Sequence, residues 1–138
     1  MGHDRGKEWK RGSRELSHAS EELGLAALAS DSFRVFVERE RALAERYGHR
    51  FAVVSLDVQP SSRDIQDIAI AQIGERIRET DLVGRGEKGE LQVLLRHVDR
   101  DSAQEIAERL TAGIVDHAIT VHTVIYPYPP PAADEPKV

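Results

Sequence analysis

The sequence predicts an α+β domain of the ferredoxin-like type, in which helices cover at least one face of a four-stranded mixed β-sheet. Three observations support this prediction. Helical and strand-like hydrophobic patterns alternate along the chain, one strand is apolar almost throughout, and two neighbouring strands are separated only by the tight turn GEKGE. Because a hairpin pairs its strands antiparallel, the sheet is expected to be mixed rather than purely parallel.

The composition is that of a single soluble domain. The chain has 138 residues, of which 40% are hydrophobic and 31% charged, and its net charge is −5. This acidic balance argues against a general nucleic-acid binder. There are no cysteines, which excludes disulfides and thiolate metal sites. No apolar run approaches the ~18 residues that cross a bilayer, and the start lacks the apolar segment of a secretory signal, so we expect a cytoplasmic protein.

The chain divides into three expected parts. Residues 1–29 are a flexible leader followed by an N-terminal helix over residues 16–29, whose small apolar residues at helical spacing favour packing on a partner protein or a second copy. Residues 30–127 form the folded domain. Residues 128–138 are a Pro-rich tail, with four prolines among eleven residues, and are expected to be disordered.

Three helices are predicted within the folded domain. The first has Ser30 or Asp31 as its N-cap and stops at Gly48. One face of this helix is expected to carry Phe33, Phe36, Val37, Glu40, Ala44 and Tyr47. The second helix covers residues 64–79 and the third residues 99–114. The third helix offers two capping boxes, Asp101 with Gln104 and Ser102 with Glu105.

The strands are predicted from their apolar and β-branched content. Residues 51–58 form a nearly continuous apolar run, which is typical of a strand buried on both faces. Residues 78–95 read as the hairpin around the turn, and residues 118–126 as the last strand.

Four segments, in this order, resemble the GGDEF domain, which is the fold of bacterial diguanylate cyclases. They are FVERERALAERYGHRFAVVSLDV, IRETDLVGR, GEKGELQVLL, and SAQEIAERLTAGI followed by ITVHTVIYP. The resemblance covers about residues 32–127. It implies that Asp57 stands at the position of a metal-binding aspartate and that residues 87–91 stand at the signature Gly-Gly-Asp/Glu-Glu-Phe.

The signature itself is altered. Glu87 and Lys88 place side chains where the two glycines of the family let the backbone approach the nucleotide. Gly89 has no carboxylate for a metal ion, and Leu91 replaces the phenylalanine. Only Glu90 is retained, so the resemblance implies a vestigial signature.

The segment after Asp57 also departs from the family. Gln59 replaces the second acid, and the stretch up to Arg78 is shorter than in the family. Two-metal phosphoryl transfer needs several carboxylates that converge on Mg²⁺, and Asp57 with Glu90 is too small a set. We therefore expect no enzymatic activity, no cofactor and no bound metal, with Asp57 as a vestigial ligand.

Residues 78–81 resemble the inhibitory product site of the family, Arg-x-x-Asp, at the expected spacing before the signature. The resemblance implies that Arg78 and Asp81 bind cyclic di-GMP and that Arg109, on the next helix, completes the site. A guanidinium binds a guanine edge or a phosphate bidentately. The alternative is structural: Asp81 begins the strand, and Arg78 is a last-turn cation favoured by the helix dipole.

The remaining residues point to no other chemistry. None of the six histidines forms a helical i, i+4 pair with an acid, so no metal site is predicted. No nucleophile elbow is present, which argues against a hydrolase. The expected function is a catalytically inactive regulatory domain that is a cyclic di-GMP receptor through Arg78, Asp81 and Arg109. The alternative is a protein-interaction or dimerisation module that binds no nucleotide.

Overall fold

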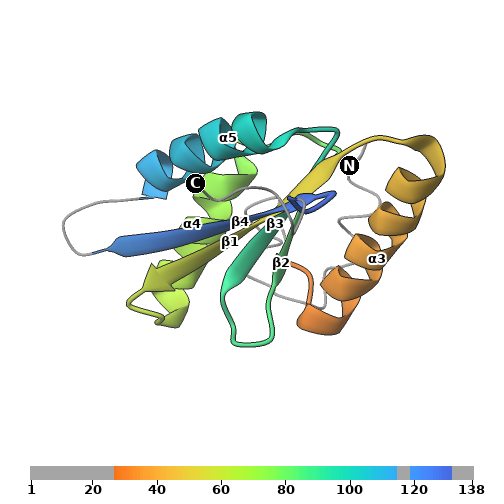
Figure 1. The fold of residues 1–138 in the computed structure, drawn as a ribbon. Coiled ribbons are helices and arrows are strands. Elements are labelled where there is room, and N and C mark those ends of the chain that lie inside the picture. Colours follow the sequence, from red (N-terminus) through yellow and green to blue (C-terminus); the bar gives the residue numbers. More distant parts are fainter. Residues whose placement is uncertain (1–26, 115–118, 132–138) are drawn as a thin grey trace, which may run out of the picture.

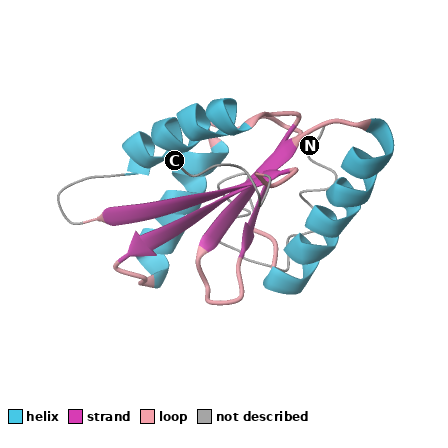
Figure 2. Cartoon of the chain, viewed as in Figure 1, coloured by secondary structure: helices cyan, strands magenta, loops and turns pink. Residues whose placement is uncertain are grey.

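The computed structural model describes residues 27–114 and 119–131, which form three helices and four strands (Figure 1). In chain order these elements are α3 (Ser30–Tyr47), β1 (Phe51–Gln59), α4 (Arg63–Gly74), β2 (Leu82–Arg85), β3 (Leu91–Arg96), α5 (Arg100–Ile114) and β4 (Thr120–Tyr128). Helices and strands alternate except at the β2–β3 hairpin (Figure 2).

The four strands form one sheet in the order β2-β3-β1-β4, and each neighbouring pair is antiparallel. The predicted α+β class with a four-stranded sheet is therefore confirmed, but the sheet is antiparallel throughout and not mixed as predicted, because β1 and β4 are also antiparallel neighbours. Parallel pairing occurs, within the described ranges, only at the isolated bridge between Leu28 and Gly84. The central position of β1 explains its apolar sequence, since it has a strand on each side and helices over both faces.

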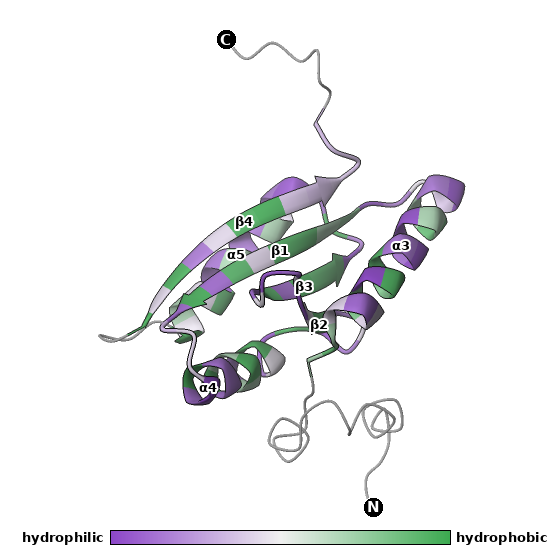
Figure 3. Cartoon of the chain, turned by 90° about the horizontal axis from the view of Figure 1, so that it is seen from below, coloured by the Kyte–Doolittle hydropathy of each residue, from purple (hydrophilic) through white to green (hydrophobic). Residues whose placement is uncertain are grey.

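The two faces of the sheet are covered unequally. Figure 1 shows α4 and α5 side by side on one face and α3 on the other. The larger core lies under α4 and α5 and includes Val54, Leu56, Ile70 and Leu95. The smaller core lies under α3, where Phe33 and Ala44 meet Phe51, Val53 and Leu94. Figure 3 shows hydrophobic segments along β1, β3 and β4, between the helices.

Helix α3 differs from its prediction at its start and on its outer face. Its N-cap is Ala29, which makes no side-chain capping bond, so the predicted caps Ser30 and Asp31 are wrong. Gly48 ends the helix as expected, at φ 78°. The predicted buried face is too wide, because α3 lies near the β2 edge of the sheet and only a narrow stripe meets it. Phe36 and Tyr47 are 37% and 68% exposed.

Helices α4 and α5 also have corrected ends. Helix α4 stops at Gly74, so the predicted helix over residues 64–79 is five residues too long, and residues 75–81 lie outside regular helix. Asp99 caps α5 in place of both predicted capping boxes, because its carboxylate accepts a 2.8 Å hydrogen bond from the Ser102 backbone N–H. This bond lowers the pKa of Asp99 below its usual value.

The predicted domain ends need correction as well. Strand β4 continues through Tyr128, whose ring stacks on Phe51 at 5.1 Å and whose hydroxyl donates to Glu45 at 3.0 Å. Tyr128 therefore belongs to the sheet and not to the tail. At the other end, Ala27 and Leu28 are buried and Leu28 pairs with β2, so the predicted helix does not reach residue 29.

The remainder of the predicted N-terminal helix, and residues 132–138 of the predicted tail, lie outside the described residues. Within the described part of the chain, none of the helices has the length and apolar character that a membrane crossing requires.

Candidate functional site

The hairpin turn, residues 86–90, is closed by its own groups. Gly86 N–H donates to the Glu90 carbonyl at 2.7 Å, and Gly89, at φ 88°, donates to the Gly86 carbonyl at 3.1 Å. The Glu90 carboxylate accepts from the Lys88 N–H at 3.1 Å. It also lies over Gly86, where an added Cβ would come within 2.2 Å of it. Glu90, which the resemblance assigned to the signature, is thus engaged in holding its own turn.

A cleft of about 480 Å³ lies between this turn, the first half of α3 and the open part of the sheet. Its charged side chains are balanced: Arg34, Arg85 and Lys88 face Glu38, Glu87 and Glu90 (all line the cleft). Arg34 lies 3.6 Å from Glu87 across the opening, between Nη1 and Oε2. This charge balance is unlike the cationic pocket that a triphosphate favours.

Asp57 lies near the end of β1 that is next to the hairpin turn. The last β1–β3 pair is Leu56 with Leu91, so Asp57 and Glu90 directly follow and precede paired residues. The Asp57 carboxylate is exposed and accepts from the Gln59 amide at 2.9 Å. The structure therefore brings the two predicted acids, Asp57 and Glu90, to the same end of these two strands. Each carboxylate accepts a hydrogen bond from a residue two positions away in the sequence.

Residues 78–81 form a closed turn around a buried carboxylate. Asp81 is 4% exposed. Its Oδ2 accepts from the Arg78 backbone N–H and from Nε, both at 3.1 Å, and its Oδ1 accepts from Arg78 Nη2 at 3.0 Å and the Arg96 N–H at 3.3 Å. The Arg78 side chain is 51% exposed and also donates to the Arg96 carbonyl. Asp81 therefore acts within the protein, while Arg78 presents part of its guanidinium to solvent.

Arg109 is exposed on α5. Among the described residues no ion pair or hydrogen bond joins it to Arg78 or Asp81, but its helix does approach the segment of residues 75–81 that contains them. The Arg76 guanidinium packs over Gly113, where an added Cβ would lie 2.5 Å from Nε. The assignment of Arg109 to a ligand site remains a prediction.

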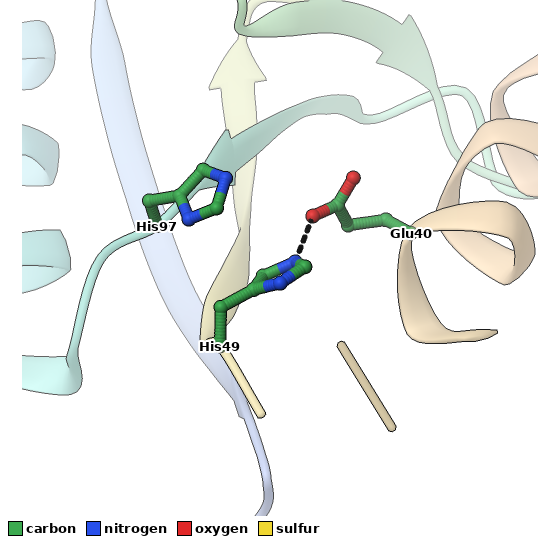
Figure 4. A group of neighbouring side chains, drawn as sticks. All are labelled: Glu40, His49 and His97. Atoms are coloured by element: carbon green, nitrogen blue, oxygen red, sulfur yellow. Dashed lines mark hydrogen bonds and ion pairs between the residues drawn. The ribbon is translucent and has the colours of Figure 1, made fainter. Parts of the chain in front are cut away.

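Sequence reasoning missed one cluster entirely. Glu40, His49 and His97 lie together although they come from α3, the residue after Gly48, and the residue after β3 (Figure 4). No fixed spacing joins them, so no motif could identify them. The only signal in the sequence is an acid, Glu40, on the apolar face of a helix.

Comparisons with known proteins place the fold. No family model matches the chain, and no curated protein matches its sequence. A DGC protein from Thermotoga maritima matches with a TM-score of 0.66 and 18% identity, over 75% of this chain and 82% of that one. The coiled coil and GGDEF domain of DgcB from Caulobacter crescentus, in complex with c-di-GMP, matches with a TM-score of 0.68 and 13% identity, over 86% and 73%.

A third match adds a bound protein. The diguanylate cyclase SiaD from Pseudomonas aeruginosa, in complex with its activator SiaC, has a TM-score of 0.59 and 19% identity, over 86% of this chain and 55% of that one. At these identities the matches show a common fold. The described chain is therefore a GGDEF-like domain in its architecture.

Proposed function

We propose that this GGDEF-like domain is regulatory and does not synthesise cyclic di-GMP. The observation that carries the proposal is the hairpin turn, where Glu90 is bonded to the turn itself and Gly89, which the resemblance assigns to the position of a metal-binding acid, has no carboxylate. Asp57 alone cannot hold the Mg²⁺ ions on which phosphoryl transfer depends. The balanced charges of the adjoining cleft support the same conclusion, since Glu87 pairs with Arg34 at 3.6 Å and adds a negative charge that a triphosphate would meet there. A cytoplasmic location is part of this proposal.

The test is incubation of the full chain with GTP and either Mg²⁺ or Mn²⁺, followed by chromatography of the nucleotides. A purified diguanylate cyclase of the same fold serves as the positive control. We expect no cyclic di-GMP above the enzyme-free background. Metal-dependent product that disappears in a Glu90→Gln variant would overturn the proposal.

The regulatory role includes binding of cyclic di-GMP at the exposed side of Arg78. The bidentate pair with Asp81 fixes the plane of the guanidinium, which supports a contact with a guanine or a phosphate. Asp81 is buried and bonded on both oxygens, so its part in this proposal is to position Arg78 and not to accept from the ligand. Calorimetric titration of the full chain with cyclic di-GMP is the direct test; no heat at ligand concentrations around 100 µM would exclude this binding.

A protein-interaction module is the second candidate, favoured by a hollow of about 350 Å³ beside α3. Phe36 and Leu43 line it and are 37% and 36% exposed. Paired apolar side chains at the rim of a hollow are typical of docking surfaces. In this reading the titration with cyclic di-GMP is silent, while Phe36→Ser changes the assembly state of the full chain in light scattering and leaves its circular dichroism unchanged.

A further inference from the structure

Glu40 is a buried carboxylate on the apolar side of α3. Its side chain is 5% exposed, and the nearest buried positions on the same helix face are Phe33 and Ala44. A carboxylate in such surroundings is unfavourable unless both oxygens have partners. Arg96 Nε lies 2.8 Å from Oε1, and His49 Nε2 lies 2.6 Å from Oε2. The contact with Arg96 is an ion pair without a hydrogen bond from Nε, whereas His49 is hydrogen-bonded to Oε2, so Oε2 is the oxygen on the side of the histidines.

Two imidazoles reach this carboxylate from different parts of the chain. His49 follows the helix stop at Gly48, and His97 follows the last residue of β3. Their ring centroids are 4.3 Å apart, with an angle of 35° between the planes. One nitrogen of each ring and one Glu40 oxygen lie within 4.8 Å of one another (Figure 4). His49 is largely buried, whereas His97 is exposed, so the cluster is open to solvent on one side.

His97 also has a backbone conformation that needs a reason. Its φ is 58°, and it is the only non-glycine residue with positive φ in the part of the chain that the structure describes. L-residues avoid this region, although histidine enters it more often than most. Strain of this kind is concentrated at ligand sites and switches. Here it turns the chain at the end of β3 so that an exposed imidazole lies against His49.

We propose that Glu40, His49 and His97 form a binding site for a divalent transition-metal ion, with zinc as the best fit. Two imidazoles and one carboxylate are typical zinc ligands, and three protein ligands leave a fourth position for water or a substrate group. Calcium and magnesium prefer oxygen ligands alone. With metal–ligand distances of about 2.0–2.1 Å, a tetrahedral ion separates its ligand atoms by about 3.3 Å. The atoms are now between 2.6 and 4.8 Å apart, so small side-chain rotations suffice.

The surroundings suit a partly open site. Arg96 forms an ion pair with Oε1 and leaves Oε2 for the ion. The positive charge of Arg96 disfavours a bound dication. The negative charge of Glu79, which lines the same hollow as Glu40 and Arg96, partly offsets this repulsion. Zinc would link α3 to the turn before β1 and to the end of β3, two segments that the sheet already places next to each other, since Phe51 pairs with Arg96.

The competing explanation is that the cluster only anchors α3 through hydrogen bonds. His97→Gly separates the two, because glycine adopts a φ of 58° without strain and removes one ligand. We expect this variant to fold at least as stably as the original chain without metal, and to bind zinc at least tenfold more weakly. His122→Ala, which removes an exposed histidine from β4, is the matched control and should bind zinc unchanged.

The measurement is calorimetric titration of the full chain with zinc chloride, together with nitrogen NMR of the histidine rings. His3, His18 and His117 could also bind zinc, so a variant with all three replaced by alanine is titrated in parallel and should keep the site. Zinc-dependent ring shifts confined to His49 and His97, with the tenfold loss in His97→Gly, would support the proposal. Equal zinc affinity in His97→Gly, or no saturation of the triple variant below about 100 µM zinc, would overturn it.

Discussion

Phe33 of α3 packs directly against the backbone of Gly84 in β2. A Cβ added at Gly84 would lie 2.3 Å from Phe33 Cδ1 and 2.7 Å from its Cβ. Phe33 is 2% exposed and packs within the smaller core, so it has little room to move away from an added side chain. The absence of a side chain at Gly84 is what lets α3 approach this edge of the sheet.

Gly84→Ala is therefore expected to lower the free energy of unfolding by about 1–3 kcal/mol through overpacking. Urea denaturation followed by circular dichroism measures this change. Gly89→Asn is the control, because Gly89 has open space around it and asparagine tolerates its φ of 88°. A similar loss in both variants would show that close packing against Phe33 is not the cause.

Truncation at two positions measures how much Leu28 contributes to the stability of the domain. A chain that starts at residue 27 keeps Leu28, which is buried and makes two backbone hydrogen bonds to β2. A chain that starts at residue 30 loses it, and should be less stable than the first by about 2–5 kcal/mol, the range for loss of a buried leucine. Urea denaturation of both chains tests this; equal midpoints would mean that Leu28 adds nothing to the core.

Asp81→Asn should destabilise the domain even without any ligand. The substitution replaces an oxygen acceptor with an amide donor facing the Arg78 and Arg96 N–H groups. We expect a loss of about 1–3 kcal/mol, which is the usual range for unpaired buried polar groups. Arg78→Ala should cost less, since its side chain is half exposed. Thermal unfolding of both variants gives the ranking, and the reverse order would contradict the positioning role of Asp81.

Arg78→Ala should weaken cyclic di-GMP binding by roughly ten- to a hundredfold. A charge-assisted contact contributes about 1.5–3 kcal/mol, and ~1.4 kcal/mol corresponds to a factor of ten. Arg109→Ala should have a smaller effect, because Arg109 only supplements the site. Arg46→Ala, at an exposed position in the last turn of α3, is the control. Calorimetry in which Arg46→Ala and Arg78→Ala weaken binding equally would point to general charge attraction.

The cap at Asp99 predicts a specific acid dependence. The Ser102 backbone N–H lowers the pKa of Asp99, so the charged form stabilises the folded state. This contribution is present above the pKa of the unfolded chain and is lost as the pH falls through the lower pKa of the folded state. Asp99→Ala should be less stable than the original chain at pH 7 and should approach it at strongly acidic pH. A stability difference that does not change with pH would mean that charge plays no part in the cap.

The sequence predicts most of the framework, because its elements depend on local patterns. The apolar run of β1, the stop at Gly48 and the hairpin around residues 86–90 all appear where periodicity and turn chemistry place them. The end of α4 was not predictable in the same way. Ile77 still packs against the core, which continues the helical pattern, yet the chain has already left the helix at Gly74.

The site was less predictable, because its contacts are tertiary. Asp81 is closed off by Arg96, fifteen positions later in the chain, and nothing in Arg-x-x-Asp itself indicates that partner. Glu40 reads as one polar residue in a hydrophobic stripe until His49 and His97 are brought beside it. When the partners of a residue come from other helices and strands, no fixed spacing in the sequence marks the contact.

The bridge made by Leu28 has a consequence for self-association. Strand β2 is an outer strand, and its outward Val83 carbonyl and Arg85 N–H are both bonded to Leu28, at 2.9 and 3.0 Å. At the opposite margin β4 contains Pro127, which has no N–H to offer a further strand. Unpaired margins of this kind recruit strands from other molecules. Leu28 therefore blocks the free edge of β2. Its loss would expose unpaired backbone groups on this edge strand, to which strands of further copies of the chain could add and so start aggregation.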